Sequence, residues 1–200
     1  DPYLAIPIAI LLIGGIGALI QRGLIQRVLD AHPLNQIVLL VGVSTLLIGL
    51  VQFFFSAEPR SIHVPYETEV VTLFALRMSI PRLIAFFASM LISLGLFLFL
   101  RYTRTGKAIR AVSQSREAAQ LMGINVKYIY MLTFGIGTAI TAVAGVLLAP
   151  NHRMIPTMGQ AYSIIAFVVV VLGTMGNFVG AFIGGLIIGI VETFAGFFLG

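Results

Sequence analysis

Cysteine is absent from this chain of 200 residues, and charged residues make up only 10% of it. Without cysteine, neither a disulfide framework nor a thiolate metal site can form. The three histidines, His32, His63 and His152, lie far apart in the sequence. Hydrophobic residues make up 59% of the chain, and its mean hydropathy is +1.06, far above the average of soluble domains. The composition therefore predicts an integral membrane protein, and we expect no cofactor.

Regular alternation of apolar and polar residues is also missing, which argues against membrane-spanning strands. The long apolar runs instead approach or exceed the roughly 20 residues that a helix needs to cross a bilayer. They cover Tyr3–Ile20, Leu34–Phe55, Leu83–Leu100 and Tyr128–Ala149. We predict an all-α fold, a polytopic bundle of transmembrane helices.

Both ends of the chain are apolar. An apolar span begins within two residues of the start, with neither a methionine nor a basic segment ahead of it, which is not typical of an ordinary signal peptide. The last residues, ETFAGFFLG, are still apolar. We expect residues 1–200 to be a single transmembrane domain, a section of a longer polypeptide with further helices at both ends.

The few charges predict the orientation of the helices. Six of the twelve Lys and Arg residues fall in loop 101–127, against one acid. Loop 56–82 has three cations and three acids. Because positive residues in short loops mark the cytoplasmic side, loop 101–127 is expected inside and loop 56–82 outside. By alternation, loop 21–33 is expected inside and segment 150–160 outside.

A different pattern begins after residue 160. The run AYSIIAFVVVVLG has thirteen residues and ends at Gly173, so a helix here is short for a membrane crossing. We predict a broken or re-entrant helix near 161–177, either a thin crossing or a half-helix that turns back. Broken helices of this kind often line transport pathways.

The run after this break is rich in glycine. Gly176, Gly180 and Gly184 recur every four residues, and Gly185 and Gly189 repeat the spacing. Such a bare helix face favours close helix packing, with a translocation pathway as the alternative.

Two polar residues in this part of the chain have open roles. Asn177 lies in the break, where it either caps the next helix or contacts a substrate. Glu192 is an acid within an apolar run, so it is either functional or solvated near the end of its helix.

The charged segment TRTGKAIRAVSQSREAAQLMGIN, residues 103–125, contains a GK pair like that of a phosphate-binding loop. The pair fails the loop pattern G-x-x-x-x-G-K-[ST]: Ala108 follows Lys107, and Arg101 stands where the first glycine should be. We also find no Ser/His/Asp or paired-carboxylate pattern. The sequence therefore gives no indication of an enzyme.

The same segment predicts a short helix. Ser115 is a good N-cap, Glu117 suits the positive start of a helix, and Gly123 suits the position after its end. Ala118, Leu121 and Met122 share one face and form a small apolar patch. Small side chains at 118 and 119 would let another surface approach. On the residues alone, this patch either rests in the membrane interface among anionic lipids or contacts another protein.

The string Glu117 to Gly123, EAAQLMG, resembles the cytoplasmic EAA-x-x-x-G signature of ABC importer permeases, without the I-x-L-P ending often seen after the glycine. The wider run RYTRTGKAIRAVSQSREAAQLMGINV is similar to permeases of high-affinity branched-chain amino acid importers. PRS at 59–61, LFALRMSIPRL at 73–83 and VLGTMGNFVGAFIGGLIIGIVE at 171–192 agree in order and spacing. In that family an outer hairpin often has glycine where this chain has Ala75.

This resemblance implies a permease domain in a bacterial or archaeal cytoplasmic (inner) membrane. It implies three partners besides membrane lipid: ATP-binding ABC subunits that hydrolyse ATP, a second permease subunit, identical or different, and an extracytoplasmic substrate-binding protein. No nucleic acid is expected. The loop helix would be a coupling helix that docks on the ATPase. The implied ATPase-coupling residues are Gly106, Arg110, Glu117, Ala118, Ala119, Leu121, Met122 and Gly123. The pathway or packing residues are Gly173, Gly176, Asn177, Gly180, Gly184 and Glu192.

Three candidate functions, which fall in two functional classes, stay open at this point. The first is an ABC permease for branched-chain amino acids, and the second is an ABC permease for urea, short amides or sugars. The third is an ion-coupled secondary transporter or channel, in which Glu192 would titrate or bind an ion.

Overall fold

The computed structural model describes residues 2–29, 31–56, 58–61, 70–73, 76–174 and 176–199. It divides into two compact units, Asp1–Ile155 and Pro156–Gly200, and each is described by itself. His63 and Ala75, named above, lie outside the described residues.

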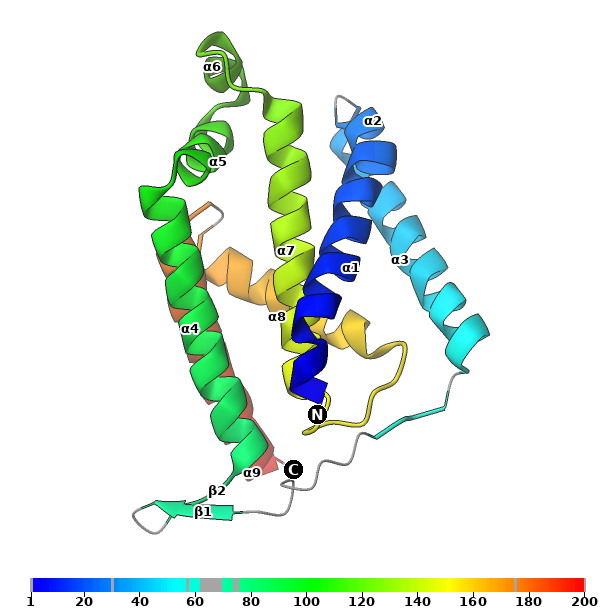
Figure 1. Cartoon of the computed structure of the whole chain (residues 1–200), viewed down its shortest axis with the longest axis vertical. Helices are drawn as coiled ribbons and strands as arrows, with labels where there is room; N and C mark the ends of the chain where they lie inside the picture. Colours follow the sequence, from blue (N-terminus) through cyan, green and yellow to red (C-terminus); the bar gives the residue numbers. More distant parts are fainter. Residues whose placement is uncertain are drawn as a thin grey trace. The chain divides into compact units, whose positions relative to one another are not determined.

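The first unit contains the first seven α-helices (Figure 1). A 3₁₀ turn, Pro2–Ala5, leads into α1, Ile6–Ile20, which continues through a π-helical turn, Gln21–Ile25, into α2, Gln26–Val28. The helices that follow are α3 Pro33–Phe55, α4 Ile80–Tyr102, α5 Arg104–Gln114, α6 Arg116–Leu121 and α7 Val126–Leu148.

The predicted membrane helices are confirmed. Five helices are long and apolar enough to cross a membrane, and most of their large apolar side chains are exposed in the isolated chain. These exposed stretches are expected to face lipid or neighbouring helices. The candidate spans are Pro2–Val28, Leu34–Phe55, Ile80–Tyr102, Val126–Leu148 and Phe178–Phe198.

Small residues bring α1 and α7 together, side by side in Figure 1. A Cβ atom added to Gly14 would lie 3.1 Å from the Cβ of Ala139, and one added to Gly17 would overlap the side chain of Thr138. Such contacts replace a hydrophobic driving force where the surroundings are as apolar as the helices. Next to this crossing, the polar Gln21 is buried at the start of the π-helical turn.

The connection between α3 and α4 includes a small antiparallel hairpin of β1, Val70–Leu73, and β2, Leu76–Ser79. A hairpin in this position is what the family resemblance implied. Earlier in the same connection, Arg60 pairs with Met154 through two backbone hydrogen bonds, 3.0 and 2.8 Å long. This bridge joins the connection to the segment that follows α7.

The second unit consists of α8, Met158–Leu172, and α9, Phe178–Leu199. At 1.5 Å per residue, the 15 residues of α8 are about 22 Å long, less than the roughly 30 Å of the hydrocarbon core. The predicted interruption of the helical run is therefore present, and it lies between Leu172 and Phe178.

Candidate coupling surface and helix break

The short helix predicted in the charged segment is confirmed as α6. At its start the Ala118 N–H donates to the side-chain oxygen of Ser115 over 3.2 Å, and Glu117 lies in the first turn. A cap of this kind contributes about 1 kcal/mol. Because six residues would not hold a helix in water, α6 depends on such end contacts and on packing.

Gly123 ends α6 with a φ of +80°, a left-handed conformation that suits glycine. Its N–H donates to the Gln120 carbonyl, and the Ile124 N–H donates to the Ala119 carbonyl over 3.0 Å. These two bonds form a Schellman motif, which satisfies carbonyls at the end of the helix. Ile124 then packs against the buried cluster beneath. Gly123 thus determines where the chain turns after α6.

The side chains of α6 divide into an inner and an outer set. Ala119 is 3% exposed and packs with Val112, Val126 and Ile129. Leu121 and Met122 are 89% and 82% exposed, and Ala118 is also exposed. We name Ala118, Leu121 and Met122 the α6 tip. Ala119 lies behind this surface and fixes the helix in place. A partner protein can therefore touch the α6 tip directly, but not the side chain of Ala119.

Sequence reasoning missed the longer helix α5. Thr103 caps it by accepting from the Gly106 N–H over 2.9 Å. Its inner face contributes Val112 to the buried cluster, with Ala108 and Ile109 packed against that cluster. The apolar residues at 108, 109 and 112 follow helical spacing, a signal that the many cations of the segment obscured.

Gly106 lies where α5 turns back against the end of α4. A Cβ atom here would meet the Phe99 carbonyl oxygen and would lie 2.6 Å from the Leu100 Cα. Backbone leaves no room for a side chain, so Gly106 is part of the bend and does not form an outer surface. Arg110, by contrast, is exposed, and its guanidinium donates to the Arg101 carbonyl over 3.4 Å.

The break in the second unit is a tight turn. Thr174 and Gly176 have φ values of +67° and +88°. Asn177 then accepts hydrogen bonds from the N–H groups of Val179 (3.1 Å) and Gly180 (3.2 Å), so it caps α9. This bonding occupies its side-chain oxygen and corresponds to the capping alternative.

Glycines allow the end of α8 and the start of α9, on the two sides of this turn, to pack against each other. Gly173 is buried, and the backbones of Gly173 and Gly180 approach so closely that a Cβ on either would overlap the other chain segment. At Gly184 an added Cβ would lie 3.1 Å from the Val169 carbonyl oxygen. These three glycines are in packing contacts within the unit.

Glu192 lies on α9, within the candidate span Phe178–Phe198, and its side chain is exposed in the isolated chain. Glu192 comes fifteen residues after Asn177, which is about 22 Å along a helix at 1.5 Å per residue. The structure therefore does not bring Glu192 and Asn177 into one site.

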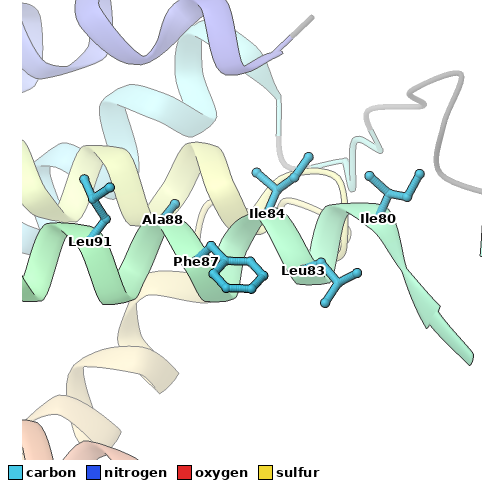
Figure 2. Close-up of a pocket in the computed structure, with 6 residues that line it drawn as sticks. All are labelled: Ile80, Leu83, Ile84, Phe87, Ala88 and Leu91. Carbon is cyan, nitrogen blue, oxygen red and sulfur yellow. The ribbon is translucent and has the colours of Figure 1, made fainter. Parts of the chain in front are cut away.

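An open hollow lies along one face of α4 (Figure 2). All the side chains that line it come from this one helix, and they carry only carbon atoms. Such a surface has no polar group to orient a polar substrate, so we interpret it as a helix face for lipid or another helix. The lining residues are Ile80, Leu83, Ile84, Phe87, Ala88 and Leu91.

Comparison with known proteins places these features in a family. Residues 1–200 match the family described as "Branched-chain amino acid transport system / permease component". The high-affinity branched-chain amino acid transport system permease protein LivH of Escherichia coli K12 is 45% identical over 107 residues, which cover 53% of this chain and 35% of that protein.

More distant relatives match almost the whole chain. A probable branched-chain amino acid transport permease protein LivH of Methanocaldococcus jannaschii is 26% identical over 99% of this chain and 64% of the relative. The ribose import permease protein RbsC of Haemophilus influenzae is 28% identical over 95% of this chain and 59% of the relative. No solved structure matches the chain.

The chain thus aligns with about a third of the length of the first relative and less than two thirds of the others. The match to the family nevertheless covers residues 1–200, with the helical spans and the EAA-like helix in place. This chain belongs to the family of branched-chain amino acid transport permeases, which are multi-pass membrane proteins without a catalytic domain.

Proposed function

We propose that this chain is the membrane-spanning permease part of an ATP-driven ABC importer. It would translocate branched-chain amino acids that an extracytoplasmic binding protein delivers. A second permease subunit, identical or different, would complete the pathway, and separate ATPase subunits would drive it. The family match over residues 1–200 is the observation that carries this proposal.

Within this assembly we assign the α6 tip to the ATPase. Leu121 and Met122 expose large apolar surfaces outside the candidate membrane spans. Exposed apolar groups of this kind gain free energy when a partner protein buries them. The cap at Ser115, the turn at Gly123 and the buried Ala119 hold the tip rigid, so a movement of the ATPase would be passed on to α7 and α4.

Coupling requires that the ATPase contact differs between its ATP-bound and ATP-free states. If closure of the ATPase pair moves α6, the short links at its two ends transmit that movement directly: Ser115 joins α6 to α5, and residues 122–125 join it to α7. Glu117 would form the charged rim of the contact. Arg110, which lies on α5, would stand outside it, and Gly106 would fix the bend between α4 and α5.

This assignment is tested with Ala118→Glu. A bulky charge on the tip blocks close approach and must be desolvated at the contact, so the ATPase should no longer copurify and uptake should be lost. Membrane insertion should be normal, because residue 118 lies outside the spans. Ser113→Glu adds the same charge at an exposed position of α5 and is the matched control. Copurification of the ATPase with the Ala118→Glu variant at the control level, with uptake unchanged, would refute the assignment.

The orientation of the chain has its own test. The assignment places residue 115 in the cytoplasm and residue 61 outside, as the charges of the loops predict. In intact cells a membrane-impermeant thiol reagent should label Ser61→Cys and not Ser115→Cys, in a chain that has no native cysteine. Labelling of Ser115→Cys alone would reverse the orientation.

Two alternatives remain as candidate functions. The similarity to a ribose import permease favours a sugar as the alternative substrate, and urea or short amides belong to the same class. Competition of labelled leucine uptake by leucine, ribose and urea separates these substrates.

The other alternative is an ion-coupled transporter in which Glu192 acts. Its uptake would follow an ion gradient without ATP, and Glu192→Gln would abolish it.

A further inference from the structure

One face of α5 is a row of cations. Arg104, Lys107 and Arg110 recur every three residues, and all three side chains are exposed. At 100° per residue they lie within about 120° of each other around the helix axis, so they share one face. The sequence of α5, RTGKAIRAVSQ, contains no acid. We name Arg101, Arg104, Lys107 and Arg110 the basic stripe, with Arg101 contributed by the last turn of α4.

The stripe lies at the end of a membrane span. Only Thr103 separates α4, whose candidate span ends at Tyr102, from α5. The Arg101 guanidinium carbon lies 5.7 Å from the centre of the Phe97 ring and 5.6 Å from that of the Tyr102 ring. An exposed tyrosine beside an arginine at a helix end is typical of the level of lipid headgroups.

The opposite face of α5 holds the stripe in position. Val112 is 5% exposed in the cluster with Val126 and Ile129 of α7. The Thr103 cap and the close approach at Gly106 fix α5 against the end of α4. In Figure 1, α5 lies beside the ends of α4 and α7, whereas α6 lies farther along the chain's long axis. The row of cations thus lies on the face of α5 opposite this buried cluster, at the edge of the span.

These charges have no acidic partner among the residues that the structure describes. The hydrogen bond of Arg110 goes to the Arg101 carbonyl, a neutral group. Glu117 is the single acid of segment 101–127, and it is exposed on α6. Four cations held within a few residues repel one another unless an anion lies between them. An oxygen-rich anion at membrane height is therefore the ligand that fits them best.

We propose that the basic stripe binds the phosphate headgroups of anionic phospholipids at this end of α4. Guanidinium groups bind phosphate oxygens in paired hydrogen bonds, and the Lys107 ammonium adds a point charge. The stripe and the α6 tip are then separate surfaces: α5 is attached to the lipid, and this attachment leaves α6 free for a protein. The proposal rests on the placement of α5 and not on the transport activity.

The test uses the full protein, purified in a neutral detergent and titrated with phosphatidylglycerol or phosphatidylcholine in mixed micelles. Bound lipid is counted by native mass spectrometry. The wild type should bind phosphatidylglycerol at least tenfold more tightly than phosphatidylcholine, and this preference should weaken as salt is raised. The triple variant Arg104→Gln, Lys107→Gln, Arg110→Gln should lose the preference. Millimolar inorganic phosphate should not displace the lipid.

Three further variants make the result specific. Arg104→Lys with Arg110→Lys keeps the charge and should keep most of the preference. The single change Lys107→Gln should give a smaller loss than the triple, which guards against misfolding as the cause. Arg153→Gln removes an exposed cation from another segment and should have no effect.

Lipid and the ATPase are the two possible partners of the basic stripe, and they predict opposite results for the variants. Under the proposal, the triple variant loses lipid preference and still retains the ATPase, whereas Ala118→Glu loses the ATPase and keeps the lipid preference. Equal phosphatidylglycerol binding by the triple variant and the wild type overturns the proposal. So does displacement of the lipid by free phosphate. Loss of the ATPase from the triple variant with lipid binding unchanged would assign the stripe to the protein partner instead.

Discussion

In the part of the chain that the structure describes, glycines permit a turn both at the end of α6 and at the break between α8 and α9. The two turns differ in what surrounds the glycine. At the end of α6, Gly123 turns the chain with nothing within 4 Å of an added Cβ, and the outer side chains of α6 remain exposed. In the break at 173–177, Gly173 and Gly180 bring backbone against backbone within the chain. The comparison teaches that a glycine pattern by itself does not indicate a site. What matters is whether the space that glycine leaves is filled by the chain's own backbone or stays open.

The largest expected effect concerns the filled space between α8 and α9. Gly180→Ala puts a Cβ against the Gly173 carbonyl, and backbone cannot move aside as a flexible side chain can. We expect a loss of about 1–3 kcal/mol or more, with Gly180→Leu worse than Gly180→Ala. Gly184→Ala should cost less, because its nearest contacts are 3.1 to 3.4 Å away. Folded yield and Tm in detergent are the measurements.

The matched control is Gly189→Ala, since nothing lies within 4 Å of a Cβ at that position. In a helix alanine is favoured over glycine, so this variant should be neutral or slightly more stable. A Tm for Gly180→Ala equal to that of Gly189→Ala would show that α8 and α9 do not cross at this point.

A middle-sized effect is expected at the cap of α9. Asn177→Ala leaves the Val179 and Gly180 N–H groups without their acceptor and should cost about 1 kcal/mol. Asn177→Ser keeps a capping oxygen and should be close to the wild type in both Tm and uptake. If uptake collapses in Asn177→Ser while its Tm is unchanged, Asn177 contacts the substrate and the capping interpretation is insufficient.

The smallest effect is expected where the space is open. Gly123 has nothing within 4 Å of an added Cβ, so only its φ of +80° opposes a side chain. Because α6 can fray locally, Gly123→Ala should cost less than about 1 kcal/mol of global stability and should appear mainly as faster hydrogen exchange in α6. Gly123→Asn should cost less again, because asparagine tolerates this conformation. Gly145→Ala, in open space within α7, is the control and should leave exchange in α6 unchanged. Equal exchange in the alanine and wild-type chains would mean that Gly123 does not determine the end of α6.

The sequence allowed prediction of the features that depend on local signals. Apolar runs marked the long helices, and Ser115 with Gly123 marked α6, because hydrophobic length and capping are encoded in neighbouring residues. Helix α5 was missed because its three apolar positions lie among cations that were interpreted as loop charges. The crossing of α1 and α7 was also missed. GGIGA at 14–18 and GIGTA at 135–139 are both suited to close packing, but pairing between distant segments is a tertiary choice that neither string specifies.

The candidate site shows the same limit. The apolar members of α6 were identified from helical spacing, yet spacing did not distinguish the buried Ala119 from the exposed Ala118 beside it. That difference arises from where Val112 and Val126 lie, which depends on α5 and α7. Asn177 was left between a cap and a substrate contact because either role needs only a polar side chain at a break. The hydrogen bonds to Val179 and Gly180 give it a structural role.

Cysteine cross-linking tests most directly whether the α6 tip is the surface that meets the ATPase. The chain lacks cysteine, so Met122→Cys and Lys107→Cys each introduce a single thiol on an exposed position, the first at the tip and the second on α5. With a short bifunctional reagent in membranes that contain the whole transporter, Met122→Cys should yield a covalent product with the ATPase that changes in amount between ATP-bound and ATP-free conditions. Lys107→Cys should yield little or none. A product from Lys107→Cys and none from Met122→Cys would contradict the account.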